Sequence, residues 1–512
     1  MSDLAAYPSP RRRLAIIIVA MLGTVMQVLD TTIANVALPH MQSTLGATQD
    51  QINWVLTSYI VATAIVVPAT GFLDQLLGRR QLFTVAVAGF TLSSALCGFA
   101  GSLPMMILAR VLQGLFGAVI APMAQAIMYD SNPPEERTKA MTIWSMGVMV
   151  APVLGPVLGG YLTDALDWRW VFFINVPLGI FATIGGWLLL SPRRVAREPF
   201  DAFGYVLVVV ALCALQLMLD RGSELDWFDS VEIWFELCLS IGAAWMFVVH
   251  MMSARRPLIP VAVFQDRNFL LSCLFVMANS GVLMAGAALT APLVQGLLGY
   301  STVQAGLMMM PRGAAMAVSM LVAGRLVDRV DPRLLIGCGI AVAALGQYMM
   351  TGLTPDMDQK PIIYAGLVQG GGLGLTFLPL NLMAFSTIDA KIRTYAASVA
   401  ALTRSFAGSV MIAISSALLV RNIQVSHSDV VAHITSTKVP ILGSGYIEQF
   451  GFRGSDGLAV LDVLVNKQAA IIAYIDVFYA LMWLTIGGLP LILLARRARR
   501  AGPVAAPLPD AH

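Results

Sequence analysis

The chain has 512 residues, of which 58% are apolar and only 12% are charged. Soluble globular proteins carry about 25% charged residues, so this composition excludes an ordinary water-soluble protein. The net charge of +3 does not favour nucleic-acid binding, and apolar runs recur along the whole length. These totals predict an all-α integral membrane protein.

A helix needs about 20 apolar residues to cross a hydrocarbon layer of about 30 Å. Stretches of this kind occur fourteen times, at residues 14–37, 53–73, 82–101, 105–128, 140–163, 171–191, 203–219, 230–252, 269–293, 304–323, 334–354, 361–385, 396–419 and 469–494. An even number of spans predicts that both termini lie on the same side of the membrane.

The Lys and Arg residues are distributed unequally between the two sides that this topology defines. Of the 32, 22 lie on the side of the termini, seven lie on the other side, and Arg110, Arg312 and Arg404 fall inside spans. Loops rich in Lys and Arg remain in the cytoplasm. Both termini are therefore predicted to be cytoplasmic.

A weak internal repeat divides the spans into two groups. Residues 71–80, GFLDQLLGRR, recur as residues 324–333, GRLVDRVDPR, in each case after the second span of a group of six. A Gln-Gly pair follows in both groups, at Gln113 and at Gln369. A transporter built from two such repeats places its substrate path between them.

This repeat predicts a six-helix bundle at 1–200, two extra membrane helices with a cytoplasmic linker at 201–260, and a second six-helix bundle at 261–512. The second bundle includes a long extracytoplasmic segment at about 420–468. Loops of this length are often functional, so the segment either docks a partner or only connects two spans.

Asp30 lies in the middle of the first span, where an ionised carboxylate costs about 2.5–3.5 kcal/mol. It either carries a proton or is a neutral acid that hydrogen-bonds to Thr31, to Asn35 or to a neighbouring helix. Arg110 and Arg404 are equally costly, and Arg110 is a candidate partner for Asp30. We assign Asp30, Arg110 and Arg404 to proton coupling.

The remaining site residues are predicted from their positions in or beside the spans. Those assigned to the substrate path are Thr31, Asn35, Gln113 and Gln369. Those assigned to a bending and sliding surface in the fifth span, residues 147–160 with sequence GVMVAPVLGPVLGG, are Gly155, Pro156, Gly159 and Gly160. The alternative for this surface is ordinary close packing between helices.

The two repeated basic loops have two interpretations. They either mark the cytoplasmic side by their positive charge or form a charge lock that opens when the two halves rock. The residues assigned to this gating function are Gly71, Asp74, Gly78, Arg79, Gly324 and Asp328.

Several kinds of chemistry have no support in the sequence. The five cysteines form no C-x-x-C pair, and neither H-E-x-x-H nor G-x-S-x-G occurs, so no metal site and no enzyme activity are predicted. None of the five Lys residues follows a Gly, which excludes a P-loop for ATP. We therefore expect no cofactor and a proton gradient as the energy source.

Five segments resemble the major facilitator superfamily, and specifically its fourteen-span drug:proton antiporters of the EmrB type. They are residues 29–39 (LDTTIANVALP), 110–114 (RVLQG), 155–160 (GPVLGG), 168–179 (WRWVFFINVPLG) and 219–228 (LDRGSELDWF). One feature departs from the family pattern. The repeated loop of this family usually has Asp at its fifth position, and the second copy here has Asp328 at that position. The first copy has Gln75 there and Asp74 one place earlier.

This resemblance implies a bacterial inner-membrane pump that exports hydrophobic small molecules in exchange for protons. It also implies a periplasmic adaptor and an outer-membrane channel as partners, with the 420–468 segment suited to docking. A dedicated exporter of a single metabolite, such as a siderophore, an antibiotic or a fatty acid, would share this fold. A membrane enzyme lacks a supporting motif, and a non-transporting sensor would bind its ligand without Asp30 and show no flux.

Overall fold

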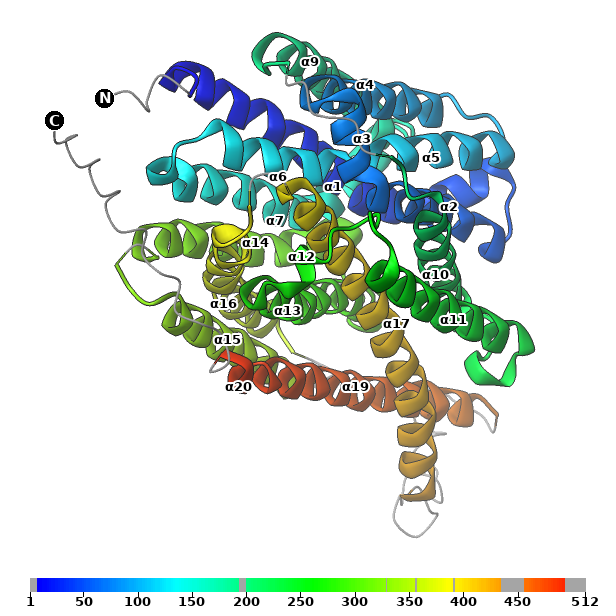
Figure 1. Cartoon of the computed structure of the whole chain (residues 1–512). Coiled ribbons are helices and arrows are strands. Elements are labelled where there is room, and N and C mark those ends of the chain that lie inside the picture. The colour runs from blue at the N-terminus through cyan, green and yellow to red at the C-terminus, as the bar shows by residue number, and fades with distance from the viewer. Residues whose placement is uncertain are drawn as a thin grey trace, which may run out of the picture.

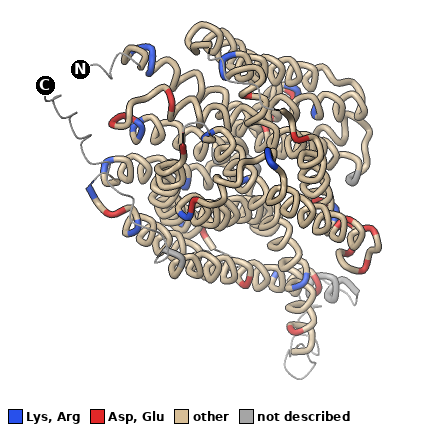
Figure 2. Tube along the Cα trace, viewed as in Figure 1, with Lys and Arg blue, Asp and Glu red and all other residues tan. Residues whose placement is uncertain are grey.

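The structure is a computed structural model that describes residues 7–192, 199–327, 329–354, 357–389, 392–433 and 455–492. Every regular element within these ranges is a helix, which confirms the all-α prediction. Most of the chain carries no charged side chain, as expected for a protein surrounded by lipid (Figure 2).

The first half of the chain forms one group of helices, coloured blue to cyan-green in Figure 1. Its elements are α1 (Pro10–Leu45), α2 (Gln49–Val66), η2 (Val67–Ala69), α3 (Thr70–Leu77), α4 (Arg79–Gly98), α5 (Leu103–Gly117), α6 (Ile120–Ser131), α7 (Pro134–Ala165), α8 (Trp170–Phe173) and α9 (Asn175–Leu189).

Two further helices and a linker follow, and they lead into the second group. These are α10 (Ala202–Arg221), η3 (Trp227–Asp229), α11 (Val231–Ser253) and α12 (Ala262–Gln265). The second group contains α13 (Arg267–Pro292), η4 (Leu293–Leu297), α14 (Thr302–Leu326), α15 (Pro332–Met349), η5 (Met350–Gly352), α16 (Gln359–Ser386), α17 (Arg393–His433), α19 (Ser455–Gly487) and α20 (Leu489–Ile492).

Within the described ranges, thirteen helices are long and apolar enough to cross a membrane, and α7 brings the number to fourteen when its two parts count as one span. These parts, Pro134–Pro152 and Leu154–Ala165, meet at an angle of 47°. Pro152 and Pro156 lie in this region and have no backbone N–H to donate within the helix. The predicted fourteen spans and the predicted bend in the fifth are therefore both present.

The internal repeat is also visible in how the helices begin. The second long helix of each half, α2 and α14, starts with a reciprocal capping box, formed by Thr48 with Gln51 and by Ser301 with Gln304. In a capping box each side chain satisfies a backbone N–H that the helix itself leaves unpaired. The same local solution therefore starts the equivalent helix in both halves.

The helices α17 and α19 extend into the segment that was predicted to be a loop at 420–468. α17 continues to His433 and α19 begins at Ser455, whereas residues 434–454 lie outside the described ranges. The end of α17 projects beyond the neighbouring helices (Figure 1). The predicted spans at 396–419 and 469–494 are thus parts of longer helices.

Asp201 anchors the inserted pair of helices at the end of the molecule that carries the termini. Its carboxylate accepts hydrogen bonds from the backbone N–H groups of Gly204 (2.9 Å) and Leu258 (3.0 Å), and lies 2.9 Å from Nε2 of His250. Burial by itself raises the pKa of Asp201, but these hydrogen bonds outweigh it and hold the pKa below its ordinary value.

This lowered pKa predicts a pH-dependent contribution to stability. Stabilisation by the Asp201 carboxylate is fully present above its unfolded pKa of about 3.9, and it is lost as the pH falls through the lower folded value. We expect Asp201→Asn to lower the melting temperature at pH 6–7 and this difference to shrink in strong acid. Melting curves of both proteins in detergent at several pH values test this; a difference independent of pH would contradict it.

Candidate functional site

The side chain of Asp30 is the centre of a fully buried polar network in the first bundle. Its Oδ2 accepts a hydrogen bond from Nη1 of Arg110 (2.7 Å), and its Oδ1 accepts bonds from Nε2 of Gln113 and Nδ2 of Asn175, both 2.8 Å long. All four residues have an exposed fraction of 0%. The carboxylate is thus enclosed by three donors from α5 and α9, one of which is cationic.

The guanidinium of Arg110 makes further contacts, although its Nη2 has no hydrogen-bond partner among the described residues. Its Nε donates to the carbonyl of Val55 (3.0 Å), and its Nη1 also donates to Oε1 of Gln113 (2.7 Å). The ring of Tyr59 lies against it, 4.4 Å from Cζ to the ring centroid. A cation over the face of an aromatic ring gains electrostatic stabilisation, and most strongly where water is absent.

This arrangement can couple protonation to structure. Two buried opposite charges stabilise each other, whereas either one alone in the same place is strongly destabilising. A proton that reaches Asp30 removes its negative charge and leaves Arg110 without its partner. A change in the charge of Asp30 therefore changes the stability of this buried network.

The predicted pairing of Asp30 with Arg110 is confirmed, but the expected local partners of Asp30 are wrong. Thr31 donates instead to the carbonyl of Val28 at 2.8 Å, and Asn35 is exposed. The amides that bond Asp30 come from other helices because Thr31 and Asn35 point away from it on α1. Asn175, which was not predicted, is a single amide in an apolar span, and that was the signal in the sequence.

Arg404 and Gln369 lie apart from this network. The guanidinium of Arg404, on α17, lies between the rings of Trp144 and Phe377, with Cζ 5.7 Å and 5.6 Å from the ring centroids. Its Nε and Nη2 have no hydrogen-bond partner in the described part of the chain. Gln369 belongs to the second bundle, where it neighbours Arg312. The four residues assigned to the substrate path are therefore not gathered at one point.

A second charged network joins the two halves at the end of the molecule that carries the termini. We call it the interbundle lock, and it contains Asp74, Arg79, Asp130, Arg393 and Thr394. The carboxylate of Asp130 pairs with Arg79 from its own half and with Arg393 from the other half. Thr394 Oγ1 donates to Oδ2 of Asp74 (2.8 Å), which lies 3.5 Å from Nε of Arg79.

The lock changes the interpretation of the first basic loop. Asp74 takes part in it although Gln75 occupies the usual position of the acid, and Asp130 and Arg393 were not predicted. Asp328, the acid of the second loop, lies outside the described residues. A charge lock thus exists in the first half, and it is made chiefly across the interface rather than within the loop.

Glycines let the two loops approach the opposite half closely. A Cβ on Gly71 would lie 2.3 Å from the ring of Tyr395, and a Cβ on Gly324 would lie 2.7 Å from Oγ1 of Thr142. Gly78 has a φ of +77°, which an L side chain rarely adopts, at the turn between α3 and α4. A side chain at Gly71 or at Gly324 would therefore collide with the opposite bundle.

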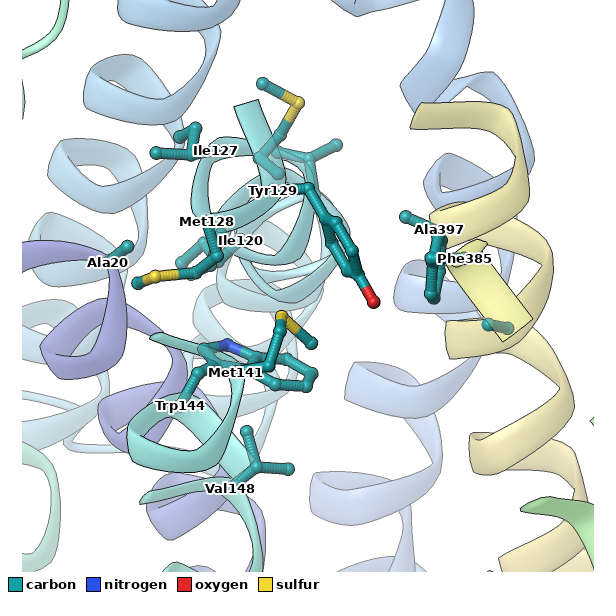
Figure 3. Close-up of a cluster of buried hydrophobic side chains, with 14 of the residues drawn as sticks. Ala20, Ile120, Ile127, Met128, Tyr129, Met141, Trp144, Val148, Phe385 and Ala397 are labelled. Atoms are coloured by element: carbon teal, nitrogen blue, oxygen red, sulfur yellow. The ribbon is translucent and has the colours of Figure 1, made fainter. Parts of the chain in front are cut away.

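An apolar layer adjoins the lock. Figure 3 shows Tyr129 of α6 between Trp144 and Met141 on one side and Phe385 and Ala397 on the other. The rings of Tyr129 and Phe385 are 5.2 Å apart, and the hydroxyl of Tyr129 donates to the carbonyl of Asn381 (3.3 Å). The two halves are therefore closed against each other at this end by charge and by apolar packing together.

The glycine-rich part of α7 forms the predicted close contact, and its partner is α1. A Cβ on Gly155 would lie 2.0 Å from Oγ1 of Thr32, and a Cβ on Gly159 would lie 3.3 Å from the Ile33 side chain. Gly160 is buried, and Pro156 lies between these glycines within the helix. The face opposite to this contact packs on the second bundle, where Gly306 meets Val157.

We expect Gly155→Ala to reduce stability by about 1–3 kcal/mol, because the added methyl group must push α1 and α7 apart. Transport should fall with it, since α7 lies between α1, which carries Asp30, and α14 of the second bundle. Gly242→Ala is the matched control, because a Cβ there meets nothing within 4 Å. The melting temperatures and the dye export of the two variants test this. If Gly155→Ala and Gly242→Ala have the same melting temperature and the same export rate, the close contact of α1 with α7 does not contribute to stability or transport.

The chain has clear relatives among known proteins. Residues 20–412 match the family model of the Major Facilitator Superfamily. "Fatty acid resistance protein FarB" of Neisseria gonorrhoeae is 35% identical over 94% of this chain and 96% of that protein. "Multidrug export protein EmrB" of Haemophilus influenzae is 34% identical over 90% and 91% of the two chains, and that of Escherichia coli K12 is 32% identical over 94% of both.

Solved structures agree on the fold at lower sequence identity. A bacterial homologue of the human lysosomal transporter Spinster, in an inward-facing and occupied conformation, has a TM-score of 0.57 at 17% identity and covers 95% of this chain and 97% of its own. The proton:xylose symporter XylE has a TM-score of 0.58 at 14% identity, with coverage of 93% and 96%.

Proposed function

Because the chain belongs to the major facilitator superfamily, and within it to the EmrB-type transporters, we propose that it exports hydrophobic and amphipathic small molecules in exchange for protons. It is a multi-pass membrane transporter without a cofactor, and not an enzyme. The observation that carries the proton coupling is the Asp30–Arg110 pair, whose members both have an exposed fraction of 0%.

The transport cycle that we propose links this pair to the interbundle lock. Protonation of Asp30 frees Arg110, and the helices that meet at the pair, α1, α5 and α9, then shift. α1 packs along α7, and α7 packs on the second bundle through α14, so a shift in the first bundle reaches the interface. Breaking the lock at Asp130 would then open the end that carries the termini.

Arg404 takes part in this proposal as a second coupling residue. It lies on α17 against Trp144 of α7, so a movement of α7 changes the surroundings of a cation that lacks a hydrogen-bond partner for two of its nitrogens among the described residues. Thr31, Asn35, Gln113 and Gln369 remain our candidates for contact with the substrate along its path.

The names of the relatives support two substrate ranges. The EmrB proteins are multidrug export proteins, which favours a broad range of hydrophobic molecules. FarB is a fatty acid resistance protein, which favours the alternative of an exporter dedicated to a fatty acid or another single metabolite. We propose the broad range, with fatty acids inside it.

We further propose that the protein lies in a bacterial inner membrane with both termini in the cytoplasm, as the excess of Lys and Arg on that side indicates. The lock then closes the cytoplasmic end. On the opposite side, α17 and α19 extend beyond their membrane spans, and we propose that this extension meets a periplasmic adaptor that leads to an outer-membrane channel.

Export by inverted membrane vesicles tests the proposed function. Vesicles that contain the protein are given a pH gradient, and substrate-dependent proton release and substrate uptake are recorded together for a cationic dye, a neutral dye and laurate. Uptake of several substrates with proton release supports the broad antiporter, and uptake of laurate alone supports the dedicated exporter. Vesicles without the protein are the control, and uptake that ignores the gradient contradicts proton coupling.

A further inference from the structure

The second bundle contains a counterpart of the Asp30 site. Gly114 packs on the backbone carbonyl of Tyr59, and a Cβ on Gly114 would lie 2.4 Å from that oxygen. Gly370 packs on the backbone carbonyl of Arg312 in the same way, and a Cβ on Gly370 would lie 2.1 Å from that oxygen. Arg312 precedes Gly324 by the same number of residues by which Tyr59 precedes Gly71. The crossing of α14 with α16 therefore reproduces the crossing of α2 with α5.

The cation in this counterpart comes from a different helix. Gly366 stands at the position that Arg110 occupies in the first bundle, three residues before the Gln of the Gln-Gly pair. Arg312 stands at the position that Tyr59 occupies in the first bundle. Its side chain lies beside Gly366, and a Cβ on Gly366 would lie 3.5 Å from the Cβ of Arg312. A guanidinium and a glutamine amide, from Arg312 and Gln369, are thus again side by side.

The acid is missing from the second copy. Gly286 of α13 faces the two groups as Asp30 of α1 does in the first bundle. A Cβ at Gly286 would lie 3.5 Å from Nη2 of Arg312 and 3.5 Å from Nε2 of Gln369. No ion pair of Arg312 is found within the part of the chain that the structure describes. The site has donors for a carboxylate but a glycine in place of one.

The donors around Gly286 are buried and incompletely bonded. Arg312 and Gln369 each have an exposed fraction of 5%. Arg312 donates from Nη2 to the carbonyl of Leu283 (3.2 Å), but its Nε and Nε2 of Gln369 have no partner among the described residues. A buried cation is costly unless an anion accompanies it.

We propose that Arg312 and Gln369 bind one small anionic group, which takes the place that the Asp30 carboxylate has in the first bundle. A guanidinium presents forked N–H donors that match a carboxylate, and the amide of Gln369 adds a further donor. The ligand is the carboxylate of an amphipathic acid or a single inorganic anion of similar size. This inference rests on the proposed export function and deepens it, since it assigns the recognition of acidic substrates to a site in the second bundle.

Two substitutions test the site in the full-length protein, purified in a non-ionic detergent. Gly286→Asp supplies the missing carboxylate from within, and Arg312→Gln removes the cation. Both should weaken the binding of radiolabelled laurate at least tenfold. Gly286→Asp should remain monodisperse, since its charge is paired by Arg312. Gly352→Asp is the control, because a Cβ there meets nothing within 4 Å.

Two further arms identify the anion. Dodecanol has the same chain without a charge, so it should not displace laurate from this site at concentrations where unlabelled laurate does. The ligand is an inorganic anion if chloride displaces laurate and if chloride alone raises the melting temperature of the unaltered protein but not that of Gly286→Asp. Chloride without either effect would identify the organic carboxylate.

The proposal is overturned if Gly286→Asp and Arg312→Gln both bind laurate and chloride as the unaltered protein does. Arg312→Gln keeps the test decisive if Gly286→Asp does not fold, because an amide replaces the cation without added bulk. The binding assay has no pH gradient, so its failure leaves proton-coupled export untouched. Failure of the vesicle experiment, in turn, does not change the binding result.

Discussion

Asp30→Asn is expected to abolish proton-coupled export and to lower the stability of the protein. The amide keeps the shape of the side chain but carries no charge, so Arg110 is left buried without its anion. Removal of one partner from a buried ion pair costs about 3–5 kcal/mol. Export driven by a pH gradient in inverted vesicles, and thermal unfolding in detergent, measure the two effects separately.

Two controls separate coupling from folding. The double variant Asp30→Asn with Arg110→Gln removes both charges, so it should recover much of the lost stability while export stays at background. Asp164→Asn alters an exposed acid and should change neither. If Asp30→Asn exports at the rate of the unaltered protein, the carboxylate is structural and the proton is carried elsewhere.

Asp130→Asn is expected to shift the protein towards a conformation that is open at the end with the termini. Asp130 pairs with Arg79 in one half and Arg393 in the other, so the substitution weakens both arms of the interbundle lock. Asp130 is partly buried, so the substitution should cost an amount at the lower end of the range of about 2–5 kcal/mol that applies to a fully buried charge pair. Full reversal of a 99:1 ratio of closed to open molecules would need about 5.5 kcal/mol. The smaller change expected here leaves both states populated, so the open state becomes detectable.

Spin labels at positions 135 and 387, in a background without native cysteines, report this opening as a longer distance between the halves. Both positions are exposed at the lock end of the protein, one in each half. Export should slow, because one conformation becomes too stable. Lys139→Gln, which removes an exposed charge near the same end, is the matched control. An unchanged distance distribution in Asp130→Asn would show that the lock does not hold the halves together.

The membrane spans were predictable from the sequence because the thickness of the hydrocarbon layer sets both the length and the composition of a crossing helix. The repeat was predictable because both halves keep similar loops. The Asp30–Arg110 pair was predictable in outline, since two buried opposite charges must each find a partner and few were available. These inferences need only the cost of placing a residue in lipid.

The other contacts of the site were decided by tertiary structure. Asn175 bonds Asp30, and Arg393 bonds Asp130, because helices distant in the chain cross at those points; nothing local to either residue specifies the crossing. Gly286 could be identified as the position of a missing acid only when α13, α14 and α16 were seen together. Hydrophobicity depends on each residue alone, so the sequence determines which segments enter the membrane, whereas hydrogen-bond partners depend on distances of about 3 Å between helices.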